Sequence, residues 1–188
     1  MIISFQGGES FKISQGDLSI AVNPQKKTSA DIALLSMHGS GAKDGGAFVI
    51  TGPGEYEARD VGVKGFLSEG AEGKINTIYM ISFEGMNLCF LGALSNPALP
   101  PETMENLEDI DILFAPVGGE GVLDAAAAYK LAVSLEPSVI IPMHYTPDTL
   151  KKFLKEAGEE GVEALDKLVV KKKDLESREG DIVILKEE

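Results

Sequence analysis

Two histidines, His38 and His144, are the only imidazoles in the 188-residue chain, and their number limits the chemistry available to it. A zinc-bound water that attacks at neutral pH needs roughly three fixed protein ligands and one open position. Two imidazoles could form such a site only together with a carboxylate, for which Asp44 and Glu55 are the candidates. Every mechanism that requires three or more imidazoles is therefore excluded.

The alternative interpretation gives neither histidine a catalytic role. In it, His144 is hydrogen-bonded within a loop that follows a buried strand, and His38 is a surface side chain of a glycine-rich segment. The single cysteine, Cys89, lies in the apolar run MNLCFLG, which indicates a buried, unreactive thiol rather than a nucleophile. The metal hypothesis thus depends on whether His38, His144 and a carboxylate converge.

A second candidate site is the glycine-rich segment 118–121, which precedes a helix that Asp124 is expected to cap. Free amide groups at a helix N-terminus attract anions. We therefore expect Gly118, Gly119, Asp124 and His144 to border a small ligand. An ordinary turn between a strand and a helix would explain the same glycines.

Composition excludes several classes of partner. Seventeen Lys and Arg against thirty Asp and Glu give a net charge of −13, so most of the surface should repel nucleic acids and anionic membranes. No apolar run approaches the roughly 20 residues of a spanning helix, and the start, MIISFQGGES, lacks the pattern of a signal peptide. We expect a cytoplasmic protein with no internal disulfide.

The candidate residues require a scaffold that brings distant loops to one edge. The first half of the chain favours short strands, at 2–6, 10–14, 17–23, 31–37, 47–51, 61–68, 74–83 and 86–92. From residue 98 onward, helices alternate with buried strands at 111–117 and 138–143. This order predicts a mixed α/β fold in which two sheets pack face to face with helices outside, an αββα sandwich within a single domain, 1–188.

Three segments resemble the metallo-β-lactamase fold: SFQGGESFKI with the following Asn23-Pro24, ITGPGEYEARDVGVKG, and FAPVGGEGVLDAAAAYKLAVSLEPSVIIPMHY. Within that superfamily they look like the small zinc-dependent hydrolases similar to ascorbate-6-phosphate lactonase. The resemblance implies an αββα sandwich. It also implies hydrolysis by one or two metal ions, usually zinc, held at one edge of the sandwich.

The segment that should carry most of the metal ligands departs from the family pattern. The family signature, Thr/Ser-His-x-His-x-Asp-His, places imidazoles and a carboxylate on one tight loop, where they can converge on zinc. The matching segment, 36–42, reads SMHGSGA, and its four ligand positions hold Met37, Gly39, Gly41 and Ala42. His38 falls on a spacer position.

Other positions of the pattern have also changed. They are the Gly-Asp turn, which is Gly92-Ala93 here, the histidine expected at Ser68 or Glu69, and the early Asp-Pro, which is Asn23-Pro24. Of the ligands that the resemblance implies, only His144 remains in register.

These losses predict a non-catalytic binding or assembly protein of a zinc-dependent hydrolase lineage, a pseudoenzyme with a degenerate metal site and no cofactor. The alternative is a metal-dependent hydrolase of a small metabolite, phosphorylated or not, with a reduced site around His144, completed by His38 and by Asp44 or Glu55. We expect a small-molecule ligand in either case. Because proteins of this branch often assemble, the resemblance also implies a homo-oligomer.

Overall fold

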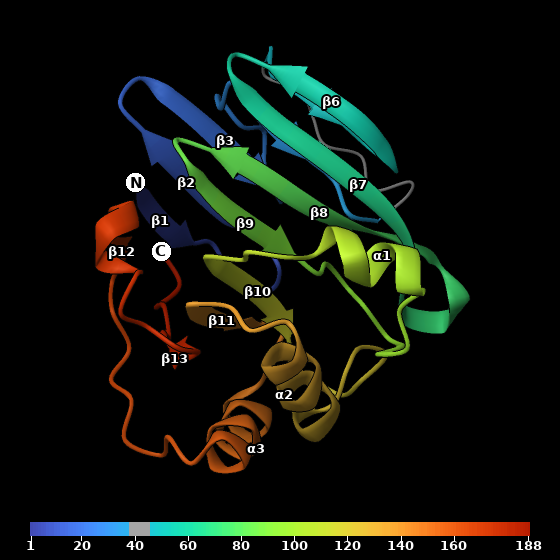
Figure 1. Cartoon of the computed structure of the whole chain (residues 1–188), viewed down its shortest axis with the longest axis vertical. Coiled ribbons are helices and arrows are strands. Elements are labelled where there is room, and N and C mark those ends of the chain that lie inside the picture. The colour runs from blue at the N-terminus through green and yellow to red at the C-terminus, as the bar shows by residue number, and fades with distance from the viewer. Residues whose placement is uncertain (38–45) are drawn as a thin grey trace.

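The computed structural model describes residues 1–37 and 46–188, which form two facing β-sheets (Figure 1). The first sheet has the order β12-β1-β2-β3-β4-β5. Its strands are β1 (Ile2–Phe5), β2 (Phe11–Gln15), β3 (Leu18–Val22), β4 (Ile32–Leu34), β5 (Phe48–Ile50) and β12 (Leu168–Val169). Strands β1, β2 and β3 form an antiparallel meander, as the alternation of the first residues predicts.

The second sheet has the order β13-β11-β10-β9-β8-β7-β6. Its strands are β6 (Gly54–Ala58), β7 (Val61–Glu69), β8 (Ile75–Phe83), β9 (Met86–Phe90), β10 (Ile112–Pro116), β11 (Val139–Met143) and β13 (Asp181–Ile182). Strands β9, β10, β11 and β13 are parallel, so the loops that follow β9, β10 and β11 leave the sheet at the same edge. This edge positions the candidate site.

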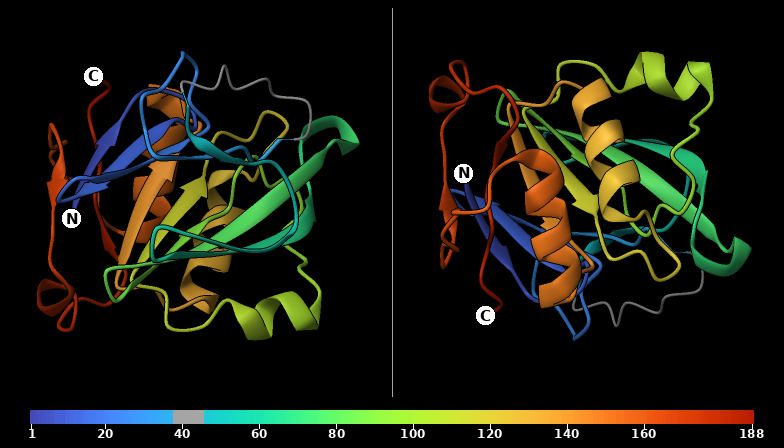
Figure 2. Two further views of the ribbon diagram at one scale, coloured as in Figure 1. Left: turned by 90° about the horizontal axis from the view of Figure 1, so that it is seen from above. Right: turned by 90° about the horizontal axis from the view of Figure 1, so that it is seen from below.

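Helices of the described chain lie on the outer face of the second sheet (Figure 2). They are α1 (Pro101–Asn106), α2 (Ala125–Ser134) and α3 (Pro147–Ala157), with the short 3-10 turns η1 (Ala71–Gly73) and η2 (Lys172–Asp174) elsewhere. The caps follow the sequence prediction: the Asp124 side chain accepts from the Ala127 amide at 2.8 Å, and Thr146 caps α3 ahead of Pro147. None of these helices is long and apolar enough to cross a membrane.

Two apolar clusters hold these layers together. The larger one fills the space between the sheets and includes the ring cluster of Phe11, Phe90 and Phe114. The other lies between the second sheet and the helices, and Phe153 of α3 packs there. Buried apolar area of this kind is the main favourable contribution to folding.

The predicted sandwich is therefore confirmed, with an asymmetry between its two outer faces. In residues 1–37 and 46–188, no helix covers the outer face of the first sheet. Side chains alternate along β2, so Phe11 and Ile13 enter the core while Lys12 lies on the outer face, which segment 24–30 partly covers.

Candidate functional site

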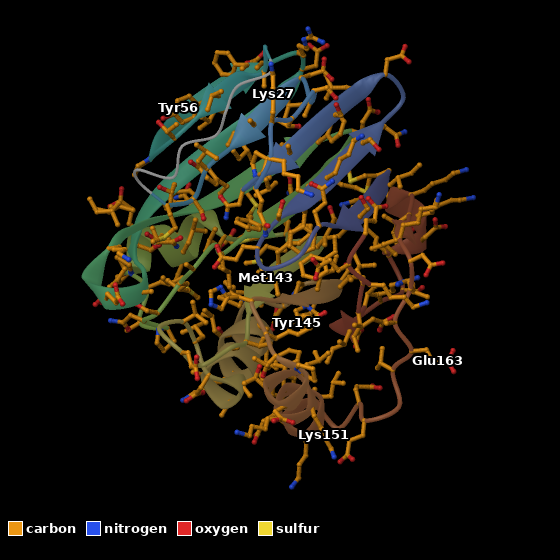
Figure 3. The ribbon with its side chains drawn as sticks, turned by 180° about the vertical axis from the view of Figure 1, so that it is seen from behind. Lys27, Tyr56, Met143, Tyr145, Lys151 and Glu163 are labelled. Atoms are coloured by element: carbon orange, nitrogen blue, oxygen red, sulfur yellow. The ribbon has the colours of Figure 1, made fainter. Side chains whose placement is uncertain are left out.

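Loops from distant parts of the chain meet at the edge where β9, β10 and β11 end. Gly92 follows β9, Gly118 follows β10 and His144 follows β11, next to Met143 and Tyr145 (Figure 3). A Cβ atom built on Gly118 would lie 2.1 Å from the His144 carbonyl oxygen, which shows how closely the two loops approach. The sequence prediction that Gly118 and His144 border one site is consistent with this contact.

His144 is held in an unusual backbone conformation, and its imidazole pairs with a carboxylate. Its φ is +52°, a left-handed value that few residues other than glycine adopt, and its amide donates to the Gly8 carbonyl at 2.8 Å. Its Nδ1 atom lies 2.5 Å from Oε1 of Glu9. The side chain of His144 is 38% exposed and that of Glu9 14%. The hydrogen bond to Glu9 raises the pKa of His144 above its ordinary value, although partial burial opposes the shift.

Glu9 is linked in turn, through Asn23, to Ser36, which follows strand β4. The Asn23 Nδ2 atom lies 3.2 Å from Glu9 Oε2 and 2.8 Å from Ser36 Oγ, to both of which it donates. The Ser36 amide donates back to Asn23 Oδ1 at 2.8 Å. Glu9 and Asn23 therefore connect His144 with Ser36, two residues after the end of β4.

Asn76, on β8, organises the other half of this edge. Its side chain is fully buried, and its Nδ2 donates to Ser68 Oγ at 2.8 Å and to the Leu91 carbonyl at 2.9 Å. Its Oδ1 accepts from the Ala93 amide at 3.0 Å. The amide of Asn76 thus bridges Ser68 and Ala93, two of the positions at which the family resemblance implies metal ligands.

Packing leaves little room at this bridge. A Cβ atom on Gly92 would lie 2.3 Å from Asn76 Oδ1 and 2.8 Å from the Ser36 Cβ atom. Gly92 also has a φ of +62°, so a larger residue would be strained as well as crowded. The turn after β9 therefore packs directly on the amide that bridges Ser68 and Ala93.

At the second candidate site, Asp124 is engaged with the backbone. Its carboxylate accepts from the Ala127 amide and so occupies the N-terminus of α2, and the Gly119 amide donates to the Leu123 carbonyl at 3.0 Å. Gly119 has a φ of +80°, as a tight turn requires. Since the carboxylate of Asp124 would repel an anion, this geometry favours the turn interpretation. Ligand binding at Gly118, Gly119 and Asp124 stays a prediction.

Of the two carboxylates proposed as metal ligands, Glu55 is described in the structure and Asp44 is not. Glu55 lies on β6 and pairs with Lys64 at 3.7 Å. Four strands separate β6 from β11, a distance of roughly 24 Å at about 4.8 Å per strand, so Glu55 cannot share a metal ion with His144. His38 and Asp44 lie outside the described residues.

The described residues do not fit a hydrolytic zinc centre. They contain no group of three or more His, Cys, Asp or Glu side chains that could hold a metal ion. The hydrogen-bonded pair at this edge, His144 and Glu9, supplies one imidazole and one carboxylate, where such a centre needs about three ligands. Cys89 adds none: it is fully buried, and burial raises the pKa of its thiol well above the ordinary range.

Sequence reasoning missed the two residues that organise this edge, Glu9 and Asn76. The composition of the opening turn, GGES, gives no hint that its carboxylate reaches a histidine 135 residues away. Asn76 did leave a signal, because an amide in the otherwise apolar strand KINTIYMISF must find hydrogen-bond partners when it is buried.

Known proteins resemble the chain in sequence and structure. A proposed zinc-dependent hydrolase of the metallo-β-lactamase superfamily from Thermotoga maritima is 27% identical with a TM-score of 0.82, and the alignment covers 100% of this chain and 99% of that one. A metallo hydrolase from Ignicoccus hospitalis is 18% identical with a TM-score of 0.65, over 90% of this chain and 99% of that one, and shows the same fold.

The chain also matches one curated relative and one family model in sequence. A metal-dependent hydrolase from Nanoarchaeum equitans is 36% identical over 69 residues, which are 34% of this chain and 32% of that protein. The match thus spans about a third of this relative's length. Residues 2–144 match the model of the beta-lactamase superfamily domain, which is well over half of the chain. The chain therefore belongs to the beta-lactamase superfamily domain family, and its fold is that of the metallo-β-lactamases.

Proposed function

We propose that this chain is a metallo-β-lactamase-fold protein that lacks the hydrolytic metal centre and acts as a non-catalytic binding or assembly module. One observation carries the proposal. The side chain of Asn76 hydrogen-bonds to Ser68 and to the Ala93 amide, and so joins two positions where the family resemblance implies metal ligands. Amide and hydroxyl groups engaged with each other stabilise the edge and bind zinc far more weakly than imidazole, thiolate or carboxylate groups do.

Metal content tests this proposal directly. The protein is purified without chelators and zinc, iron and manganese are measured by inductively coupled plasma mass spectrometry. We expect far less than one metal ion per chain, and the same value for the wild type and His144→Ala. Near-stoichiometric metal in the wild type contradicts the proposal.

The second candidate is a metal-dependent hydrolase of a small metabolite, phosphorylated or not, with a reduced mononuclear site around His144. The proximity of the Glu9 carboxylate to His144 favours it, because this pair supplies two of the required ligand types. His38 would have to complete the set. Hydrolysis of a panel of phosphorylated metabolites would then require metal and would be lost in both His144→Ala and Glu9→Gln. Activity that persists in both variants eliminates this candidate.

Assembly into a homo-oligomer remains part of the proposal. Sedimentation velocity at several protein concentrations measures it. A mass that stays at the 20.0 kDa of one chain across the concentration range would contradict self-assembly and would be compatible with a binding role.

A further inference from the structure

The outer face of the first sheet carries a polar hollow of about 360 Å³, referred to below as the outer hollow. It is lined by Gln6, Ser10, Lys12 and Ala21, by segment 24–30, and by Glu187 and Glu188. Figure 3 shows Lys27 on this side of the molecule, far from Lys151 of α3. None of these residues is a member of the hydrogen-bonded network of Glu9, Asn23 and Ser36 at the candidate site, but Ser10 directly follows Glu9 and segment 24–30 directly follows Asn23, so the outer hollow borders that site.

An unpartnered hydroxyl group faces this hollow. Ser10 is 1% exposed, and its Oγ atom has no hydrogen-bond partner in the described part of the chain. Buried polar groups are nearly always paired, because an unpaired group loses its hydrogen bonds to water without replacement. Ser10 comes directly before Phe11, which points into the core, so its side chain lies on the same outer face as Lys12. The hydroxyl of Ser10 thus needs a partner that the hollow can admit.

Three lysines surround the same space. Lys12, Lys26 and Lys27 line the outer hollow, and none of them forms an ion pair with a carboxylate of residues 1–37 or 46–188. Three unpaired cations in one place are unexpected in a chain with a net charge of −13. With Glu187 and Glu188 in the same lining, their three positive charges leave a net charge of +1, a small local excess of positive charge on an otherwise acidic surface.

The walls of the hollow are held in place by hydrogen bonds. Gln25 Nε2 donates to the Gly7 carbonyl at 3.1 Å, which ties segment 24–30 to the turn between β1 and β2. On the other wall, Glu188 Oε2 accepts from Ser4 Oγ at 3.1 Å. A preformed cavity reduces the ordering that a ligand would otherwise have to impose.

We propose that the outer hollow binds the phosphate group of a small phosphorylated metabolite. A phosphate group has several oxygens, which can accept from the Ser10 hydroxyl and from more than one ammonium group at once. The volume lies at the lower end of the range for small-molecule sites, about 300 to 1,000 Å³. Glu187 and Glu188, which also line the hollow, disfavour long polyanions and so restrict the ligand to a small one.

The probes are inorganic phosphate, glucose 6-phosphate and glucose, added to the full chain at pH 7 and followed by amide shifts in ¹H–¹⁵N NMR spectra. Both phosphate compounds should give saturable shifts at Ser10, Lys26 and Lys27, and glucose should give none. The double variant K26Q/K27Q should weaken phosphate binding by about tenfold, since it removes two charge-assisted contacts. Its matched control, K151Q/K152Q, removes the same charge from α3 and should leave the affinity unchanged.

Two further variants measure how much the Ser10 hydroxyl and the two glutamates each contribute to phosphate binding. Ser10→Ala should weaken phosphate binding severalfold without loss of the fold, whereas Ser14→Ala should not change it, because Ser14, a half-buried serine of β2, is not among the lining residues. The double variant E187Q/E188Q should tighten phosphate binding, because it removes the repulsion by the two carboxylates of the lining.

Three results would overturn the proposal. They are the absence of saturable shifts in the wild type, equal affinity of K26Q/K27Q and the wild type, and equal loss of affinity in K26Q/K27Q and K151Q/K152Q. The metal content of His144→Ala does not enter this test, so failure here and failure of the non-catalytic assignment are distinguishable.

Discussion

The two halves of the candidate edge differ in charge and in exposure. One half is neutral and buried: Asn76 joins Ser68, Leu91 and Ala93 by hydrogen bonds that satisfy its whole amide group. The other half is ionic and partly exposed, with Glu9 beside His144. The neutral half therefore contributes hydrogen bonds that hold the loops together, while the ionic half has groups that can exchange protons with solvent.

We expect the largest change in the free energy of unfolding from a substitution in the neutral half. Asn76→Ala would leave the Ala93 amide and the Leu91 carbonyl buried without partners, so we expect the free energy of unfolding to fall by about 3 kcal/mol. Urea denaturation measures it. Asn106→Ala is the matched control: its exposed side chain donates only to the Glu102 carbonyl, and we expect a loss of less than about 1 kcal/mol. Equal losses in the two variants would remove the distinction between a buried bridge and an ordinary amide.

Gly118→Ala tests how tightly the ionic half is packed. The new Cβ atom would meet the backbone oxygen of His144 at 2.1 Å, and backbone cannot move aside as a side chain can. We expect a destabilisation of about 2 kcal/mol in the same assay, together with shifted His144 resonances. Gly161→Ala, at a glycine with open space around it, should be neutral. A neutral Gly118→Ala would show that the loop after β10 can move away from His144.

A smaller effect is expected at Ser68. Ser68→Ala removes one partner of Asn76 Nδ2 but leaves the Leu91 carbonyl as the second acceptor. The expected loss is about 1 kcal/mol, against nearly none for Ser82→Ala, whose hydroxyl bonds to Asn87 in an exposed position. A loss as large as that of Asn76→Ala would show that Ser68, rather than Asn76, holds the bridge.

The fold was accessible from the sequence because its signals are local. The alternation in FKISQ predicts one strand of the meander, and the Asp124 and Thr146 caps with Pro147 predict the starts of two helices. The candidate edge was also accessible, since parallel strands bring the loops at Gly92, Gly118 and His144 together.

The features that the sequence did not predict depend on pairings between distant residues. The partner of His144 is Glu9, 135 positions away, and no periodicity or spacing rule connects the two. Glu55 was a candidate because the sequence alone gives no strand order, and the order of the second sheet places four strands between its strand, β6, and β11. The outer hollow escaped for the same reason, because it depends on which face of the first sheet the helices leave uncovered.

The smallest effect concerns protonation of the ionic half. Glu9 raises the pKa of His144 above 6.5 in the folded protein, so the folded state binds the proton more tightly than the unfolded state does. The stabilisation from this pair is therefore fully present below about pH 6.5, and it is lost as the pH rises through the folded pKa of His144. Because the imidazole is more than a third exposed, solvent screens the pair and the loss should be small.

Glu9→Gln should lower the pKa of His144, read from its imidazole resonances in an NMR titration, and flatten the dependence of stability on pH above 6.5. Glu57→Gln, at an exposed carboxylate on β6, should change neither quantity. If the titration of His144 is the same in Glu9→Gln as in the wild type, the carboxylate of Glu9 does not control that imidazole. The ionic half would then be as inert towards pH as the neutral half, and the reduced metal site would lose the one contact that favours it.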